Sequence, residues 1–400
     1  MITQIARIPN MRVVAVGDRQ PEPAVRALVD SGYAEDRIEI CDTSAQARRA
    51  MEAGKAAVLL DAARLAELPV DAVCDVTGDP IFGAEIAFRT IQEGKHMVVV
   101  NIESDVGIGP LLSREAARAG VIYTGADGDQ PSLIQGLVEW SRCLGLEVQV
   151  AGKWTTMHPP EDYDQSDRRT DLGYLDGSKN QVEMCCVANM TGLLPDRRGM
   201  HHPNVALLDM PNLFATREEG GILSQYGIVD CVNSMLPDRS IREAHLGGGV
   251  FVQVTGANPD FLKVLRSKHV IHSTDGKRGL LYRPYHLVGI EAPMTILRAV
   301  LYGEATAAPL PAPVADVVAI AKRDLQPGDR LDGIGGRMVR GEMERFEPAR
   351  AGGLLPLCLA ENVRVKCAVA KGETLTYGML EAEGRDFMWR LRRLQDNLLG

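Results

Sequence analysis

Lys153 is the residue best suited by type and position to carry chemistry. It follows the apolar run 148–151, so we expect it at the end of a buried strand rather than in open solvent. Transfer of a hydride between an alcohol and a ketone needs a proton donor or acceptor beside the substrate oxygen, and a buried lysine can serve. The alternative is a surface lysine whose stem lies along a strand, since lysine is usually exposed.

Acidic residues before and after this lysine could assist it. Asp127, Asp129 and Glu183 are acidic groups that could orient the Lys153 ammonium. Asp129 also lies two residues before Pro131, where it could cap a helix instead. We therefore predict Asp129 and Glu183 as catalytic residues.

Arg283 and His286 form the other end of the expected catalytic site. A guanidinium can make two parallel hydrogen bonds to a phosphate or a carboxylate, so these two residues could hold an anionic part of a substrate. A buried histidine with satisfied hydrogen bonds is the alternative for His286.

The adjacent pair His201 and His202 is interpreted as solvated. Neighbouring histidines on a strand point in opposite directions, so the two cannot face one ligand.

A second group of residues would bind a dinucleotide. Asp18 and Arg19 follow a predicted strand, where a carboxylate would bind the ribose 2′-OH of NAD and a guanidinium the 2′-phosphate of NADP. The two residues point to opposite cofactors, so we expect NAD and NADP both to fit. A simple ion pair in a turn is the alternative.

The remaining predicted cofactor residues lie in two loops that each follow a strand. Thr77, Gly78 and Asp79 lead into the N-terminus of a helix, which offers free amides to a nucleotide. Asn101 and Glu103 occupy the next such loop and could reach the nicotinamide ribose or amide. For Asn101 and Glu103, capping of the following helix is the alternative.

The elements that would position these residues follow a repeated βα pattern. Short β-branched runs alternate with helical stretches up to about residue 150, which is typical of a doubly wound parallel sheet. Ligands bind such sheets beyond the carboxyl ends of the strands. The predicted strands are 11–16, 37–40, 57–60, 72–76, 96–100 and 121–124.

The beginning of the chain departs from a complete dinucleotide-binding domain. Residues 1–7 resemble the end of a first helix, and residues 11–16 the second strand of such a domain. The first strand and the glycine-rich turn that normally cradles the pyrophosphate are not found. We therefore expect a Rossmann-like domain that is truncated at its N-terminus.

Changes in composition along the chain suggest four parts. An incomplete NAD(P)-binding domain over 1–150 would precede an α+β substrate domain over 151–310, rich in glycine and polar residues. A β-rich module over 311–385 would follow a proline-rich linker, and 386–400 would form a surface helix.

The bulk composition excludes several classes of function. The net charge of −9 disfavours nucleic acid and anionic membranes as partners. No apolar run approaches the roughly 20 residues of a membrane helix, and no signal peptide is recognisable. We therefore expect a cytoplasmic enzyme with a small-molecule substrate, which forms a homo-oligomer.

Short motifs recur in order along the whole chain. They are Asp75-Val76-Thr77-Gly78-Asp79-Pro80, the stretch 100–106, Gly128-Asp129-Gln130-Pro131, Ala151-Gly152-Lys153, Asp176-Gly177-Ser178-Lys179 with Glu183, Glu219-Gly220-Gly221 and the stretch 282–287, followed by 321–329 and 369–376. Together they resemble the homoserine-dehydrogenase-like oxidoreductases with a C-terminal SAF domain, a group that includes the DXR-like reductoisomerases. The SAF resemblance rests on 321–329 and 369–376.

This resemblance implies an NAD(P)-dependent oxidoreductase, with or without an isomerising step, that acts on a small polyol, keto-sugar or sugar phosphate. The resemblance to the DXR-like enzymes also implies that Asp127, Asp129 and Glu183 could hold a divalent ion such as Mg²⁺ or Mn²⁺, which prefer oxygen ligands. Homoserine dehydrogenase is an alternative, but those enzymes have a lysine directly after the Asn that matches Asn101, where this chain has Ile102. A second alternative is a non-catalytic protein that binds a sugar-like ligand, because the nucleotide-binding fold is incomplete.

Overall fold

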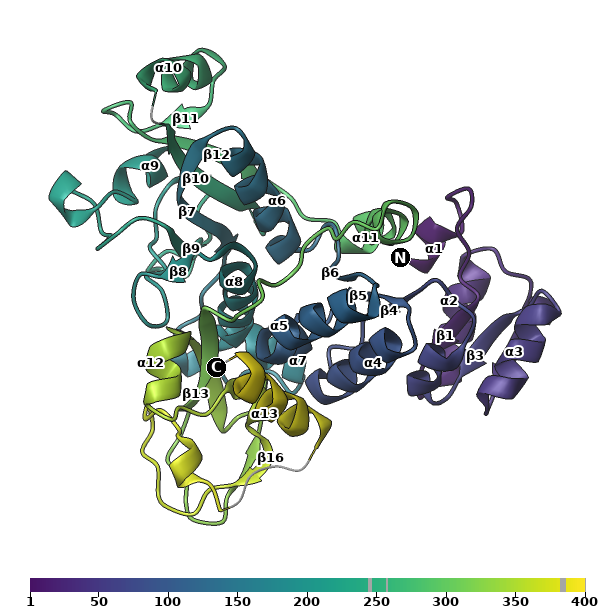
Figure 1. The fold of residues 1–400 in the computed structure, drawn as a ribbon. Helices are drawn as coiled ribbons and strands as arrows, with labels where there is room; N and C mark the ends of the chain where they lie inside the picture. Colours follow the sequence, from purple (N-terminus) through teal and green to yellow (C-terminus); the bar gives the residue numbers. More distant parts are fainter. Residues whose placement is uncertain (244–246, 257, 382–385, 400) are drawn as a thin grey trace. The chain divides into compact units, whose positions relative to one another are not determined.

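The computed structural model describes residues 1–243, 247–256, 258–381 and 386–399 (Figure 1). The chain divides into two compact units, which we describe separately. The first unit comprises 1–101, 111–129 and 287–308, and the second comprises 102–110, 130–286 and 309–400. The helix α5 (Ile102–Ala119) begins in the second unit and ends in the first.

The first unit contains two parallel sheets of three strands each. Their orders are β1-β3-β2 and β4-β5-β6, and all pairings are parallel. Each of the six predicted strands overlaps a strand of the structure, but the first begins at residue 15 instead of 11 and the sixth at residue 123 instead of 121. Their bounds are β1 (Ala15–Gly17), β2 (Ile38–Cys41), β3 (Ala56–Leu59), β4 (Ala72–Asp75), β5 (His96–Val99) and β6 (Tyr123–Gly125).

The predicted parallel strands are present, and they form two separate sheets. β1 and β4 are the edge strands of two separate sheets, and no strand of the described residues pairs with both of them. The parallel α/β character of the unit is nevertheless as predicted. That a strand and a glycine turn are missing stays a prediction.

Helices connect these strands, and their ends have recognisable caps. Thr43 forms a capping box at α3, and the Asp79 carboxylate accepts from two amides of α4, in which Pro80 is the first residue, as predicted. The helices are α1 (Ile2–Ile5), α2 (Pro21–Asp30), α3 (Ser44–Glu52), α4 (Pro80–Gln92) and α11 (Val288–Leu297), with short turns η1 (Glu35–Arg37), η2 (Ala62–Glu67) and the π-helix η6 (Arg298–Tyr302).

A mixed six-stranded sheet forms the centre of the second unit, in the order β11-β12-β10-β7-β9-β8. Residues of alternate positions on β7, β9 and β10, among them Trp154, Ile228 and Phe251, pack into one apolar cluster on one face of the sheet. The strands are β7 (Leu146–Thr155), β8 (Leu194–Pro195), β9 (Ile228–Asn233), β10 (Val250–Gly256), β11 (Ile271–His272) and β12 (Gly279–Arg283).

Two helices of this unit bear on the site. α6 (Gln130–Cys143) contacts β7, β10 and α8, and it begins one residue before the predicted start at Pro131. α8 (Ser178–Thr191) is buried on nearly all sides, which explains its run of small and apolar residues. The others are α7 (Arg169–Leu175), α9 (Met210–Leu213) and α10 (Pro259–Ser267), with turns η3 (Pro160–Asp162), η4 (Leu207–Asp209) and η5 (Arg217–Glu219).

The C-terminal part of the second unit is rich in β-structure, as predicted. Gly328 and Gly372, which lie in the stretches 321–329 and 369–376, have φ angles of +91° and +85°, a left-handed conformation that favours glycine. The elements are β13 (Ala315–Ala321), β14 (Arg330–Asp332), β15 (Val339–Arg345), α12 (Phe346–Ala351), η7 (Leu357–Leu359), β16 (Glu361–Arg364), η8 (Tyr377–Met379) and α13 (Phe387–Leu399). Its assignment as a SAF fold stays a prediction.

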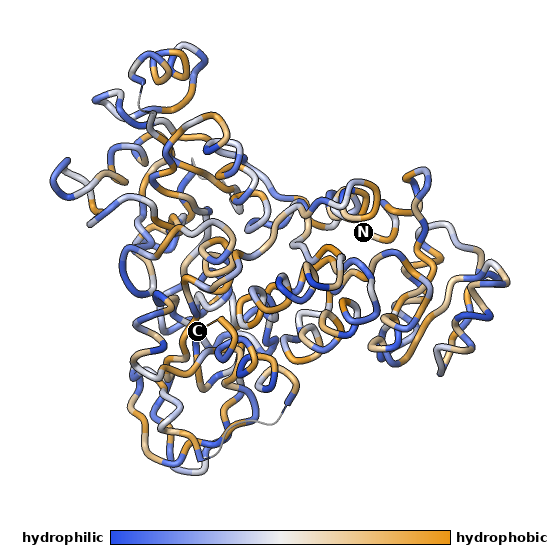
Figure 2. The backbone as a smooth tube through the Cα atoms, viewed as in Figure 1, coloured by the Kyte–Doolittle hydropathy of each residue, from blue (hydrophilic) through white to orange (hydrophobic). Residues whose placement is uncertain are grey.

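Hydrophobic and hydrophilic residues alternate along the helices (Figure 2). The eight cysteines are free thiols. No helix of the described residues is long and apolar enough to cross a membrane.

Candidate active site

Lys153 lies within β7 and is buried, with 3% of its surface exposed. Its Nζ donates to the Oε1 atom of Gln130 at 2.9 Å and forms an ion pair with the Glu183 carboxylate. Glu183 comes from the buried helix α8 and is 5% exposed. The predicted pairing of Lys153 with Glu183 is therefore present in the structure.

The surroundings of this pair explain why two charges can be buried. An isolated buried charge is strongly unfavourable, whereas a pair with additional hydrogen bonds offsets much of that cost. Glu183 supplies the opposite charge and Gln130 supplies a neutral acceptor. The ammonium is thereby held in one orientation beside the first residue of α6.

The same glutamine connects Lys153 to His286. Its Nε2 atom donates to the Gly248 carbonyl oxygen at 2.6 Å, and the His286 Nδ1 atom lies 2.9 Å from that same oxygen. Three of the predicted catalytic residues, Lys153, Glu183 and His286, thus belong to one connected hydrogen-bonded chain. Gln130 and Gly248 are its two linking members.

Gly248 is required at its position for two physical reasons. Its φ angle is +83°, a left-handed conformation that side chains rarely adopt. A Cβ atom there would also lie 2.9 Å from Cε1 of His286. The glycine therefore lets the imidazole come close to the turn.

Arg283 lies in the same cross-strand row as Lys153. Val250 of β10 pairs with Lys153 on one side and with Arg283 on the other, so all three side chains point to the same face of the sheet. Two strand spacings separate the cations, which is about 10 Å. The Arg283 guanidinium stacks over the Tyr285 ring, 4.6 Å from its centroid.

Asp129 and Asp127 precede α6 and belong to the first unit. The Asp129 amide donates to Ala126 O at 3.2 Å, and the Asp127 amide donates to Thr295 Oγ1 at 2.7 Å. A catalytic role for the Asp129 carboxylate stays a prediction.

The predicted cofactor loops of the first unit come together at the carboxyl ends of β4 and β5. The buried Asn101 side chain donates to Asp75 Oδ2 at 2.9 Å, to Thr77 Oγ1 at 3.1 Å and to the Asp79 carbonyl at 2.8 Å. Burial raises the pKa of the Asp75 carboxyl. Asn101 thus organises the loop that carries Thr77, Gly78 and Asp79.

The other predicted cofactor residues have different surroundings. Asp18 and Arg19 are exposed after β1, and Asp18 Oδ1 accepts from the Gln20 amide at 2.8 Å. Glu103, in the first turn of α5, forms an ion pair with Lys179 at 2.5 Å within the second unit. Contacts of these residues with a cofactor stay predictions.

The interpretation of His201 and His202 as solvated is wrong. The His201 ring lies 2.7 Å from Asp196 Oδ2, and the His202 ring lies 3.0 Å from Gln181 Nε2. Burial lowers the pKa of His202 to about 4, and the nearby positive charges of Arg197 and Lys153 add to this. The two rings avoid the strand geometry because they lie in a turn where His202 has a φ angle of +52°.

The buried Asp230 carboxylate holds this histidine turn. It accepts from the backbone amides of His201 and His202 at 3.1 Å and 3.0 Å and from that of Cys231 at 2.8 Å. Burial nevertheless raises its pKa to about 6. Cys231 is the direct cross-strand neighbour of Lys153. Asp230, the residue before it, therefore points to the opposite face of the sheet from Lys153.

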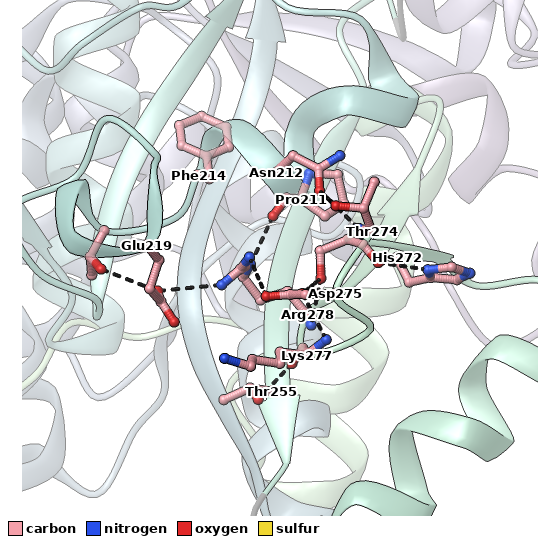
Figure 3. Close-up of polar contacts among 12 residues, drawn as sticks. Pro211, Asn212, Phe214, Glu219, Thr255, His272, Thr274, Asp275, Lys277 and Arg278 are labelled. Atoms are coloured by element: carbon pink, nitrogen blue, oxygen red, sulfur yellow. Dashed lines mark hydrogen bonds and ion pairs between the residues drawn. The ribbon is translucent and has the colours of Figure 1, made fainter.

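A separate polar cluster around Arg278 fixes the beginning of β12 (Figure 3). The buried guanidinium donates to the Pro211 carbonyl at 2.9 Å and to Asp275 Oδ2 at 3.0 Å, and it lies 3.3 Å from Glu219 Oε2. All of these partners satisfy the arginine within the protein. The cluster therefore anchors the strand whose other end carries Arg283 and leads to His286.

Sequence reasoning missed Gln130, Gly248 and Arg278. Gln130 stands in a quoted motif beside Asp129, and Gly248 is the centre of three consecutive glycines, which is a signal for close backbone approach. Nothing in the sequence marks Arg278. Within the described part of the chain, no group of three or more His, Cys, Asp or Glu side chains is arranged to hold a metal ion.

Comparisons with solved structures give only distant similarities. A probable dehydrogenase from Thermotoga maritima is 15% identical, with 76% of this chain and 85% of that chain covered at a TM-score of 0.40. An aldose-aldose oxidoreductase from Caulobacter crescentus is 12% identical, with 77% and 87% covered at a TM-score of 0.37. A myo-inositol dehydrogenase from Corynebacterium glutamicum is 12% identical, with 70% of each chain covered at a TM-score of 0.33. TM-scores this low carry no functional argument.

No curated protein matches the sequence. Residues 128–292 match the family model described as the catalytic domain of oxidoreductase DRL. All five predicted catalytic residues, Asp129, Lys153, Glu183, Arg283 and His286, lie within this stretch. The match supports an oxidoreductase.

Proposed function

We propose that the protein is an NAD(P)-dependent oxidoreductase that acts on a small polyol, keto-sugar or sugar phosphate. The observation that carries the proposal is the buried Lys153, held by Glu183 and Gln130 inside the stretch that matches an oxidoreductase catalytic domain. A buried, oriented ammonium suits proton transfer to a substrate oxygen.

The cofactor would be held by the loops at the carboxyl ends of the first unit's strands. Gly78 has a φ angle of +68° and open space where a Cβ would lie, so the loop after β4 fits the close approach of a nucleotide. Thr77 and Asn101 lie in the same network, and Asp18 and Arg19 would meet the adenosine ribose. When bound, the nicotinamide supplies or accepts the hydride.

The chain's own residues would manage the proton and the substrate. In the direction of ketone reduction, Lys153 donates a proton to the substrate oxygen, and Glu183 holds the Nζ atom in place. Arg283, in the same row of the sheet, binds an anionic group if the substrate has one. Analysis of the reaction products tests whether an isomerisation accompanies the reduction.

The experiment is a spectrophotometric assay of NADH and NADPH turnover with ketoses, polyols and their phosphates. We expect activity with at least one of these classes, and a decrease in kcat of about 10²- to 10⁴-fold in Lys153→Met. Lys263→Met, which alters an exposed pair with Asp260, is the matched control and keeps full activity. Absence of both turnover and NAD(P)H binding in the wild-type protein would refute the proposal and favour the non-catalytic alternative.

The finer assignments belong to the same proposal. The chain would share the framework of the homoserine-dehydrogenase-like and DXR-like enzymes, carry a SAF module over 311–385 and form a homo-oligomer. Homoserine serves as a further substrate in the assay, and light scattering measures the oligomeric state. Titration with NADH and NADPH in parallel tests the expectation that both cofactors bind.

A further inference from the structure

The carbonyl oxygen of Gly248 receives two hydrogen-bond donors from different parts of the second unit. One is the Gln130 amide at 2.6 Å, and the other is the His286 ring at 2.9 Å. Lys153 donates to Gln130 Oε1 at 2.9 Å, and this fixes which end of the Gln130 side chain is the oxygen. The amide nitrogen therefore faces Gly248.

This arrangement determines the tautomer of His286. A carbonyl oxygen can only accept, so the Nδ1 atom that faces it must carry the hydrogen. In a neutral imidazole the Nε2 atom is then an acceptor. His286 is exposed, and no residue of the described ranges takes up its Nε2 atom.

The position is built for this ring. Gly248 adopts a left-handed conformation with φ of +83°, and a side chain there would meet the imidazole at 2.9 Å. Gln130, the first residue of α6, is 5% exposed and holds the turn through its hydrogen bond to the Gly248 carbonyl oxygen. An exposed histidine that is fixed by a buried network at one nitrogen presents the other nitrogen in a defined direction.

We infer that His286 is a specificity residue that accepts a hydrogen bond from a substrate hydroxyl through its Nε2 atom. The sequence suggested that His286 holds an anionic group, but an unprotonated Nε2 atom accepts from an O–H donor, and its lone pair repels the oxygen atoms of an anion. Arg283 then remains the residue for any anionic group. This inference rests on the proposed function for the identity of the ligand but not for the tautomer.

The first test is nitrogen NMR of full-length protein labelled with ¹⁵N in the histidine rings, at a pH where imidazoles are neutral. His286→Asn identifies the His286 signals by their loss. We expect a protonated Nδ1 and an unprotonated Nε2 in the protein without ligand. A protonated Nε2, or an average of both tautomers, overturns the inference whether or not the protein has activity.

The second test adds glycerol, myo-inositol or inorganic phosphate to the labelled protein in the presence of NADH. We expect a neutral polyol, and not phosphate, to shift the Nε2 signal. A shift with phosphate alone, or with none of these probes in a sample that turns over a polyol, contradicts the hydroxyl contact. A sample with no turnover at all shows instead that the proposed function fails, and the tautomer is still decided by the first test.

The third test separates the two nitrogens kinetically. His286→Asn retains a donor toward Gly248 but has no group at the Nε2 position, whereas His286→Gln lacks the donor at Nδ1. We expect His286→Asn to raise KM for the hydroxylated substrate about 3- to 10-fold, as the loss of one neutral hydrogen bond would, with the loss falling on KM rather than on kcat. An unchanged KM in His286→Asn contradicts the inference.

Discussion

The Nζ atom of Lys153 and the carboxylate of Glu183 form an ion pair in which both residues are at least 95% buried. Removal of one partner leaves the other charge uncompensated. We expect Lys153→Met to lower the free energy of unfolding by about 3–5 kcal/mol, as measured by urea denaturation. The double variant Lys153→Met with Glu183→Gln should recover part of this loss. Equal stability of the single and double variants would show that the pair is not coupled.

A second prediction concerns the turn under His286. Gly248→Ala should destabilise the protein by more than the roughly 1–2 kcal/mol that a left-handed alanine costs, because the new methyl group also meets the imidazole. Gly220→Ala is the control, since Gly220 has a φ of +89° but nothing near its Cβ position. Thermal and urea unfolding of the two variants compare the effects, and equal losses would mean that the ring moves away freely.

The half-buried His202 should make the protein less stable in acid. Its pKa is about 4 in the folded protein, below the ordinary histidine value of 6.5. The neutral imidazole therefore gives its full contribution to stability above pH 6.5. As the pH falls from 6.5 toward 4, the free energy of unfolding decreases by at most about 3 kcal/mol, because the unfolded chain binds the proton more readily. Unfolding of wild type and His202→Asn at several pH values measures this, and the variant should lose less stability on acidification.

Asp230 should act in the opposite direction over nearly the same range. Burial raises the pKa of Asp230 from the ordinary 3.8 to about 6, so the folded protein favours the protonated carboxyl. The contribution of this group to the free energy of unfolding is therefore complete below pH 3.8 and is lost as the pH rises through 6. Asp230→Asn should therefore remove the decrease in the free energy of unfolding that the wild-type protein shows as the pH rises from about 4 through 6. If both variants follow the wild-type pH profile, neither group is buried as the structure has it.

Arg278 should stabilise the protein in a way that a lysine at the same position does not. Arg278→Met leaves Asp275 and Glu219 without their shared cation, and we expect a loss of about 2–4 kcal/mol in unfolding free energy. Arg278→Lys should recover little, since lysine lacks the planar fork that reaches several acceptors. The exposed pair of Lys263 with Asp260 is the comparison, and Lys263→Met should cost less than about 1 kcal/mol.

The sequence by itself determined the local elements. The strands of the first unit and the cap at Asp79 follow from apolar runs, from proline at a helix start and from short-range hydrogen bonds between neighbours in the chain. The burial of Lys153 was predictable for the same reason, because the apolar run before it must lie inside a sheet. The net charge likewise disfavoured whole classes of partner.

Only the tertiary structure decided what Lys153 contacts. Gln130 and Glu183 are 23 and 30 residues from it in the sequence, and Gly248 is 118 residues from Gln130. These side chains meet because α6 and α8 pack against β7 and β10, and local patterns do not encode such packing. The tautomer that we infer for His286 depends on one backbone carbonyl in a distant turn, so it could be inferred only from the folded chain.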